Sequence, residues 1–457
     1  MSNKLTVTFC SGVGTVTGAN FLLETEKSKI LIDCGMIQGE KFATEENSKL
    51  FSYDIPTIDA LLVTHAHLDH VGRIPKLVKE GYLGPIYSTP KTKELAEIVL
   101  TDAVGILALE AKQNGTLPLY GIEDVEMVFM SWKTIPYHQE VKIVDDISVV
   151  LKDSGHILGS AMIEVTVRGP ASRKILFTGD LGNSPAPLLR DTEEVDDVDF
   201  IIMESVYGDR NHEPKELRLR QFEKVIDDTL ARGGTLVIPA FSIDRTQVLL
   251  YELNNLVEQK KIPSVPVFVD SPMAIKATEI YQSSPELFND KVRQQIKNGD
   301  NIFSFPHLQF TVSQNESRDI ERLRGAKIIL AGSGMSVGGR VLSHEEDFLP
   351  DPKNTILLVG YQTAGSLGRQ LANGAKKVSI HGRTIKVKAH IETIYGYSAH
   401  KDSDHLVEFV TTASDRLKQI FVVMGELKAS MHLAQRLNDE LMVKAIVPER
   451  ERGYELE

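Results

Sequence analysis

A dense group of metal-binding residue types directly follows an apolar run near the start of the chain. The run is IDALLV, and residues 65–70 just beyond it read HAHLDH. Alternate histidines at a strand end can direct two imidazoles at one ion, and the acid and histidine after them can reach a second ion. Two-metal hydrolytic sites hold their ions roughly 3.5–4 Å apart. The candidate metal ligands in this segment are His65, His67, Asp69 and His70.

Four further polar residues stand at the ends or turns of other apolar runs. Asp33 ends KILID, Asp180 ends KILFTGD and Glu204 ends DFIIME, whereas His156 lies in SGHILGS. Taken singly, an aspartate before glycine is typical of a turn, and a histidine between glycines of a hydrogen-bonded loop. Together with the histidine-rich segment they predict one site assembled from several strand ends, because a single loop rarely closes a two-metal centre.

The elements that must position these residues fall into two patterns. Up to about residue 207, short strand-like runs dominate, with one helix expected over 91–109 behind Pro90. Strands are expected at 5–10, 20–25, 29–35, 58–64, 147–154, 161–167, 174–180 and 199–205.

Beyond residue 207 helices alternate with buried strands, which predicts a parallel, doubly wound α/β domain. Helices are expected over 214–231 and 244–260, and strands over 234–241, 265–271, 327–332 and 355–360. The last part of the chain offers strands in 385–391 and 419–425 and a helix over 430–441.

Size and composition favour two domains and exclude several classes of protein. The chain has 457 residues, of which 42% are hydrophobic, more than one compact core needs. Only two cysteines are present, Cys10 and Cys34, so a disulfide framework is excluded and a cysteine-based zinc site is not expected. No apolar run could span a membrane and the first residues do not resemble a secretion signal, so we expect a cytoplasmic protein.

The chain is acidic as a whole, but one segment of it contains no acidic residue. A net charge of −12 argues against indiscriminate binding to polyanions. Residues 352–391, however, contain no aspartate or glutamate. This segment is either an ordinary solvated face or part of a nucleic-acid groove. Its basic residues are Lys353, Arg369, Lys376, Lys377, Arg383, Lys386 and Lys388.

The order and spacing of these residues resemble the metallo-β-lactamase superfamily. Asp33, the HAHLDH segment, His156 and Asp180 match its motifs. The segments ESVYGDR (204–210) and YSAH (397–400) resemble two motifs of its β-CASP family. Three further segments resemble the RNA-processing members of that family: GGR (338–340), GYQ (360–362) and GSLGR (365–369).

The resemblance covers essentially the whole chain and implies an α/β fold of a particular kind. A metallo-β-lactamase αββα sandwich would be built from residues 1–207 and 386–457, with a doubly wound α/β β-CASP domain inserted over 208–385. It also implies two zinc ions. The implied ligands are His65, His67 and His156 for the first ion, Asp180 as a bridge, and Asp69 and His70 for the second.

The resemblance assigns further roles around the metals. Asp33 would orient ligand imidazoles without binding metal. His400 would be the general acid, oriented by Glu204, and Asp69 is also expected to be catalytic. Residues expected to reach substrate phosphates are Arg340, His344 and Arg369, with capping and carboxylate pairing inside the inserted domain as the alternative.

Met424 departs from the family pattern. It stands in FVVMGE (421–426), where RNA-acting members carry a histidine ligand to the second zinc. A thioether is a weak zinc ligand, so the second site could be weak or need more metal. The chain could also be a catalytically impaired relative that binds nucleic acid. DNA-acting members likewise lack the histidine, although they carry a small apolar residue there.

The predicted function is zinc-dependent hydrolysis of phosphodiester bonds, with single-stranded RNA as the expected substrate. Cleavage inside the RNA, from its 5′ end, or both, and a homodimer, all stay open. The alternatives are a DNA-acting nuclease, a nucleic-acid-binding subunit, and a thioesterase or lactonase. The last two enzymes would need neither the Glu204–His400 pair nor a large inserted domain.

Overall fold

The computed structural model describes residues 5–39, 42–169, 172–363, 365–413 and 416–457, which form two units. Unit 1 comprises Met1–Gln38, Phe42–Asn211 and His400–Glu457, and unit 2 comprises Gly39–Lys41 and His212–Ala399. The second boundary therefore lies later than the 385/386 division expected from the sequence. The reason is a strand, β19 (His390–Ile394), which pairs in parallel with β16 (Thr355–Val359) inside unit 2.

Unit 1 contains two sheets, each with seven strands among the residues described. In spatial order the first sheet is β22 (Gly453–Glu455), β1 (Thr6–Ser11), β2 (Asn20–Glu24), β3 (Lys29–Ile32), β4 (Ala60–Leu62), β5 (Ile86–Ser88) and β6 (Trp132–Thr134). The second is β21 (Ala445–Ile446), β20 (Gln419–Val422), β11 (Phe200–Met203), β10 (Arg173–Phe177), β9 (Ala161–Val167), β8 (Ile147–Asp153) and β7 (Val141–Val144).

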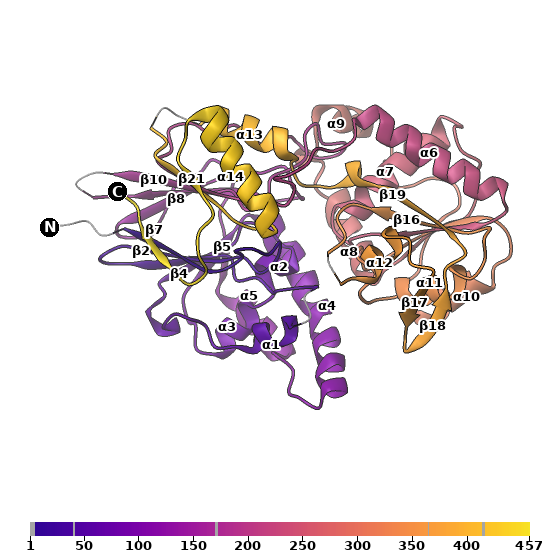
Figure 1. Ribbon diagram of the computed structural model, residues 1–457, viewed down its shortest axis with the longest axis horizontal. Coiled ribbons are helices and arrows are strands. Elements are labelled where there is room, and N and C mark those ends of the chain that lie inside the picture. Colours follow the sequence, from indigo (N-terminus) through magenta and orange to yellow (C-terminus); the bar gives the residue numbers. More distant parts are fainter. Residues whose placement is uncertain (1–4, 40–41, 170–171, 364, 414–415) are drawn as a thin grey trace. The chain divides into compact units, whose positions relative to one another are not determined.

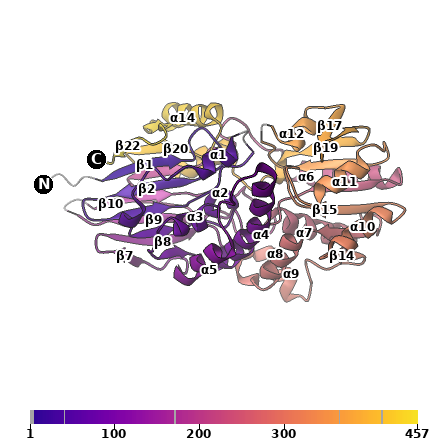
Figure 2. The same cartoon turned by 90° about the horizontal axis from the view of Figure 1, so that it is seen from below.

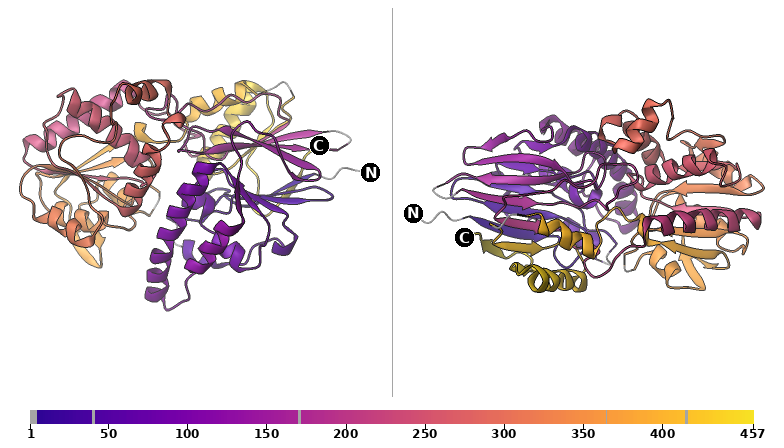
Figure 3. Two further views of the ribbon diagram at one scale, coloured as in Figure 1. Left: turned by 180° about the vertical axis from the view of Figure 1, so that it is seen from behind. Right: turned by 90° about the horizontal axis from the view of Figure 1, so that it is seen from above.

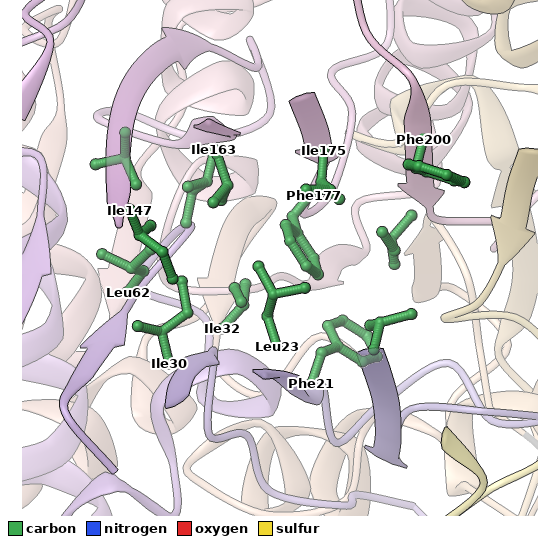
Figure 4. Close-up of a cluster of buried hydrophobic side chains, with 14 of the residues drawn as sticks. Phe21, Leu23, Ile30, Ile32, Leu62, Ile147, Ile163, Ile175, Phe177 and Phe200 are labelled. Carbon is green, nitrogen blue, oxygen red and sulfur yellow. The ribbon is translucent and has the colours of Figure 1, made fainter. Parts of the chain in front are cut away.

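The two sheets pack face to face through the side chains that alternate along their strands. Phe21 and Leu23 of β2 point from the first sheet toward Ile175 and Phe177 of β10 in the second (Figure 4). Successive strand residues point to opposite faces, so every second apolar residue enters this layer. The Phe21 and Phe177 rings stack with their centroids 6.4 Å apart. Burial between the sheets is therefore what holds the strand ends of unit 1 in fixed positions.

Helices cover the outer faces of both sheets and complete an αββα sandwich (Figure 1). Beside the first sheet lie α1 (Ala43–Ser48), η1 (Ile55–Thr57), α2 (Leu68–Val71), α3 (Ile74–Lys79), α4 (Pro90–Asn114) and α5 (Ile122–Ser131). Beside the second lie α13 (Ser403–Thr411) and α14 (Leu427–Leu441). The four-layer arrangement is the fold expected from the sequence.

The long helix α4 shows how local sequence sets an element's ends. It begins at Pro90, behind Thr89, whose side chain accepts a hydrogen bond from the Thr92 amide. It ends before Gly115, which adopts the left-handed conformation typical of a helix C-cap. Figures 2 and 3 show α4 as the longest helix of unit 1. It is longer than the 91–109 helix expected from the sequence.

Unit 2 is a doubly wound α/β domain. Its six-stranded sheet, among the residues described, is parallel throughout and has the order β14 (Leu308–Phe310), β13 (Val267–Asp270), β15 (Lys327–Ala331), β12 (Thr235–Pro239), β16 and β19. Helices α10 (Gln314–Arg322), α11 (Val341–Phe348) and α12 (Leu367–Ala372) pack on one face. The remaining helical elements of unit 2 are α6 (Lys215–Ala231), α7 (Arg245–Glu258), α8 (Pro272–Gln282), η2 (Pro285–Leu287), α9 (Asp290–Lys297) and η3 (Tyr395–Tyr397).

A two-stranded antiparallel hairpin is added to unit 2. It consists of β17 (Lys377–Ile380) and β18 (Arg383–Lys386), and it lies beside α11, whose Glu346 contacts His381 and Arg383 of the hairpin (Figure 1). Its residues Val378 and Ile380 are buried in the same core as α11 and α12. No helix in the described residues is both long and apolar enough to cross a membrane.

Candidate metal centre

The histidines and acids singled out in the sequence come together at one edge of unit 1. His65 and His67 occupy the loop between β4 and α2, and His156 lies in the loop between β8 and β9. Asp180 follows β10. These four side chains each offer one ligand atom, and the four atoms lie within 4.8 Å of one another. The convergence across distant segments is what a site built from several strand ends requires.

The distances within this group form a compact set. His67 Nδ1 lies 3.2 Å from His65 Nε2 and 3.2 Å from His156 Nε2. Asp180 Oδ2 lies 3.4 Å from His65 Nε2 and 3.5 Å from His156 Nε2. A tetrahedral zinc ion with ligands at about 2.0–2.1 Å separates its ligand atoms by roughly 3.3 Å. The spacing of the three imidazoles and the carboxylate therefore fits one tetrahedral ion.

Unpartnered polar atoms support the same interpretation. Buried His70 Nε2 and Asp180 Oδ1 have no hydrogen-bond partner, and they lie 3.4 Å apart. Buried polar groups are normally hydrogen-bonded, because leaving one unpaired costs about 1–3 kcal/mol. A cation between these two atoms would satisfy both. Sets of imidazole and carboxylate ligands suit several divalent cations, zinc among them, so the residues present fit a divalent metal centre.

Asp33 fixes the orientation of the His70 ring through a contact to its Nδ1 atom. Its Oδ2 lies 2.7 Å from His70 Nδ1 and accepts a hydrogen bond of 2.8 Å from the Thr64 hydroxyl. Its Oδ1 accepts a second from the Thr64 amide at 2.8 Å. With Nδ1 held by a carboxylate, His70 presents Nε2 to Asp180. Asp33 therefore does more than form the turn after β3.

The backbone of the histidine-rich loop is packed too tightly for a side chain at Gly35. A Cβ atom there would lie 1.5 Å from the carbonyl oxygen of Asp69. The same carbonyl accepts a hydrogen bond of 2.9 Å from the Ala19 amide. Glycine at this position lets the β3 end approach the loop closely, which fixes the loop against the first sheet.

The pKa values of the group follow from burial and mutual charge. Burial lowers the pKa of His67 and His156 well below the usual range, so both imidazoles are neutral and able to bind metal. Burial opposes ionisation of Asp180, but the nearby histidines outweigh it and hold its pKa well below normal. Desolvation raises the pKa of Asp69, whose carboxyl interacts electrostatically with His70 and Asp180.

A second pair, Glu204 and His400, adjoins the metal-binding group. His400 Nδ1 lies 3.1 Å from each oxygen of Glu204 and 4.0 Å from Asp180 Oδ2. Glu204 is fully buried and accepts a hydrogen bond of 2.7 Å from the Leu181 amide. Burial opposes protonation of His400, yet Glu204 and Asp180 raise its pKa to about 9. A protonated imidazole with 22% of its side chain exposed is suited to donate a proton.

Met424 packs into the hydrophobic core of unit 1. It is 2% exposed, belongs to the cluster between the sheets, and its sulfur would touch a Cβ atom placed on Gly12. Its backbone has a positive φ of 47° and accepts a hydrogen bond from the Ser205 amide. The thioether thus has an apolar packing role at the position where the resemblance expects a metal-binding histidine.

Arg340 and His344 are held by an internal acid of unit 2. Asp270 ends β13, and its carboxylate accepts a hydrogen bond of 2.6 Å from Arg340 and lies 2.7 Å from His344 Nε2. Arg340 also donates to the carbonyl oxygens of Thr311 and Val312. His344 is fully buried. These contacts match the alternative of carboxylate pairing within the inserted domain, and they leave His344 without access to a bound substrate in this conformation.

Arg369 is partly exposed near the end of α12. Its Nε donates a hydrogen bond of 2.7 Å to the Gln362 carbonyl oxygen, and its guanidinium lies 5.5 Å from the Tyr361 ring centroid. Its charge is not paired with an acid in any contact shown by the described residues. Of the three residues expected to contact phosphates, Arg369 is therefore the one whose charge stays available.

The sequence alone assigns no role to three residues that hold the singled-out side chains in place, two in unit 1 and one in unit 2. Thr64 contacts Asp33, His65 and His70 through one hydroxyl, and Ser160 accepts hydrogen bonds from the His156 and Ile157 amides. Asp270 was not identified as the partner of Arg340 and His344. Thr64 and Ser160 flank motif residues in the chain, which is a usable signal. For Asp270 the only signal is its place at the end of a buried strand.

Family models match three parts of the chain. A metallo-β-lactamase superfamily domain matches residues 22–192, a β-CASP domain matches 246–371, and a Zn-dependent metallo-hydrolase RNA specificity domain matches 384–448. A solved structure of a protein of unknown function from Enterococcus faecalis is 15% identical, with a TM-score of 0.55 over 99% of this chain and 100% of that chain. At this identity the match shows the fold alone.

Curated relatives are similar over most of the chain. Ribonuclease TTHA0252 of Thermus thermophilus is 35% identical over 86% of this chain and 88% of its own length. Transcription termination factor FttA of Methanosarcina mazei is 33% identical over 96% of this chain and 69% of its own. The FttA protein of Pyrococcus horikoshii is 32% identical over 98% and 70%, respectively.

Proposed function

Because the chain belongs to the β-CASP family of the metallo-β-lactamase superfamily, we propose that it is a zinc-dependent ribonuclease that hydrolyses phosphodiester bonds in single-stranded RNA. The observation that carries this proposal is the convergence of His65, His67 and His156 on Asp180 at tetrahedral spacing. The match to an RNA specificity domain and the similarity to a named ribonuclease support RNA as the substrate.

The chain's own residues would hold the two cations in complementary ways. Three imidazoles, those of His65, His67 and His156, would bind the first, and Asp180 would bridge to the second, beside His70 and Asp69. When bound, the ions supply Lewis acidity at the phosphate and acidify water near neutral pH. His65, His70, His156 and Asp180 are buried, which limits competition from bulk water, and Asp33 keeps the His70 ring in its binding orientation.

His400 would donate a proton to the leaving oxygen. Glu204 would stabilise the protonated His400 ring and hold its orientation. The raised pKa of His400 supports a charged donor at neutral pH, and its partial exposure supports access to substrate. Removal of such a general acid reduces turnover by roughly 10²–10⁴-fold. Because Glu204 is itself held by the Leu181 amide, the donor position is fixed relative to Asp180.

Cleavage of matched substrates tests this proposal. The zinc-loaded protein is incubated with labelled single-stranded RNA and with DNA of the same sequence. We expect RNA cleavage that is lost in Asp180→Ala and retained in Asp145→Ala, a control at an acid whose side chain is 94% exposed. Circular dichroism of both variants checks that loss of activity is not loss of fold.

The outcomes separate the alternatives. Cleavage of DNA but not RNA would identify a DNA-acting enzyme. Failure to cleave either polymer, with zinc bound and the fold intact, would contradict the proposal and favour a binding subunit. In that case recovery of activity in Met424→His would attribute the loss to the missing histidine.

A further inference from the structure

The β17–β18 hairpin of unit 2 places two lysines directly opposite one another. Lys377 of β17 is the cross-strand partner of Lys386 of β18. Like charges in directly opposed positions destabilise an antiparallel pair. The next outward-facing pair is Ser379 and Thr384, which carry hydroxyls. The arrangement therefore concentrates positive charge and hydrogen-bond donors on one face at a cost in local stability.

The neighbouring residues reinforce this charge and do not neutralise it. Lys376 precedes β17, Lys388 follows β18, and both are exposed, as are Lys377 and Lys386. In the parts of the chain that the structure describes, none of these four lysines forms an ion pair, although Arg383 pairs with Glu346 at 3.1 Å. Within the acid-free stretch of the sequence, the hairpin thus carries a group of exposed lysines without an acidic partner.

The opposite side of the hairpin explains why the lysines face outward. Val378 and Ile380 are 4% and 2% exposed and pack in the core of unit 2, with Ile385 partly buried against it. Because side chains alternate along a strand, burial of these residues fixes Lys377 and Lys386 on the solvent side. The orientation of the charged face is therefore set by the core and does not depend on a bound partner.

We propose that the outward face of the β17–β18 hairpin, made by Lys377, Ser379, Thr384, Lys386 and Lys388, binds the phosphate backbone of RNA. This inference rests on the proposed ribonuclease function, which supplies a polyanion as substrate. None of the residues of this face is aromatic, so it offers bases no stacking platform. Binding here is through charge and hydroxyl donors, and it is independent of RNA sequence.

The size of the effect follows from counterion release. Each phosphate contact on a single strand contributes a slope of about −0.7 to the dependence of log affinity on log salt. At 0.1 M salt one contact is thus worth roughly 5-fold in affinity, and two contacts roughly 25-fold. The double variant Lys377→Gln/Lys386→Gln is expected to weaken RNA binding by about 25-fold and to reduce the slope by about 1.4.

The experiment measures the anisotropy of a labelled single-stranded RNA over a range of salt, with the full chain carrying Asp180→Ala to prevent turnover. The matched control is Lys291→Gln/Lys297→Gln, which removes the same charge from exposed lysines of unit 2 on α9. The control is expected to change affinity less than 2-fold. The variant Lys377→Arg/Lys386→Arg keeps the charge and is expected to keep the affinity.

Stability provides a second readout. Removing the opposed charges is expected to leave the melting temperature unchanged or to raise it, while RNA affinity falls. A hairpin with only a structural role would show the reverse: a lower melting temperature and loss of affinity in the arginine variant as well. That pattern would overturn the inference.

The remaining outcomes keep this inference apart from the proposed function. If the parent chain binds RNA and the glutamine variant binds it equally well, the hairpin inference is wrong while the ribonuclease proposal stands. If the unchanged protein neither cleaves nor binds RNA, both are wrong. If the glutamine variant loses affinity for polyglutamate but not for RNA, the surface binds acidic protein and the inference is wrong.

Discussion

The substitution Asp270→Asn should destabilise unit 2 more than any surface change in it. The Asp270 carboxylate is fully buried and receives four side-chain contacts of 2.5–2.7 Å, from Thr311, Ser317, Arg340 and His344. The amide nitrogen of asparagine is a donor and cannot accept from any of them. The substitution therefore removes the charge that holds Arg340 and replaces at least one attractive contact by a donor–donor clash.

The expected loss follows from the burial of Asp270, whose partner Arg340 has a side chain that is 20% exposed. Removing one partner of a buried ion pair costs about 3–5 kcal/mol, because the other charge is left uncompensated. For a unit of this size, 1 kcal/mol corresponds to roughly 3 °C, so the melting temperature should fall by about 10 °C. The control Asp319→Asn removes an acid that is 69% exposed beside Arg322, and should cost less than about 0.5 kcal/mol.

The stability difference between the parent protein and Asp270→Asn should also depend on pH in a defined direction. Burial opposes ionisation of Asp270, but the hydrogen bonds from His344, Ser317, Thr311 and Arg340 outweigh it and hold the pKa well below its usual range. A carboxyl with a lowered folded-state pKa stabilises the fold above its unfolded pKa, about 3.9. That contribution is lost as the pH falls further, so the difference between parent and Asp270→Asn should narrow below pH 4.

Differential scanning calorimetry at pH 7, 5 and 3 measures both quantities. Equal melting temperatures for Asp270→Asn and Asp319→Asn at pH 7 would refute the assignment of Asp270 as the central acceptor of the network. If the difference in melting temperature between the parent and Asp270→Asn instead widens toward pH 3, the Asp270 carboxyl is not ionised in the folded state.

Three further outcomes are expected from other positions. Met424→Leu should keep the metal content, because Met424 packs in the core. Met424→Ala should lower the free energy of unfolding by about 2–5 kcal/mol. Loss of one metal equivalent in the leucine variant would show that the sulfur is a ligand. Glu252→Gln should lower the free energy of unfolding in urea by about 3 kcal/mol, since buried Arg218 loses its partner at 2.8 Å, and adding Arg218→Met should recover part of it. Chelation should abolish RNA cleavage and zinc should restore it; activity that persists after chelation would contradict a metal-dependent mechanism.

The parts of the site that could be predicted from sequence are those whose positions follow from neighbouring residues in the chain. The HAHLDH segment follows a buried strand, so the directions of its histidines were set by a few adjacent residues. Asp33, His156 and Asp180 could be grouped with it because each also ends or adjoins an apolar run. In each case a short apolar run identified the strand, and the strand end identified the polar residue.

The parts that could not be predicted depend on contacts between distant residues. Strand β19 belongs to unit 2 because it pairs with β16, and nothing in its own sequence shows that partner. Asp270 lies far along the chain from Arg340 and His344, so its role as their acceptor appears only in the folded domain. The core position of Met424 likewise depends on how β20 meets the turn at Gly12.

Anomalous diffraction from crystals of the zinc-loaded protein, recorded on both sides of the zinc absorption edge, tests the metal centre most directly. We predict two peaks per chain, one bound by His65 Nε2, His67 Nδ1 and His156 Nε2 at about 2.0–2.1 Å, with Asp180 touching both ions. Anomalous density absent from this group, or zinc bound elsewhere in a protein that cleaves RNA, would contradict the two-metal centre.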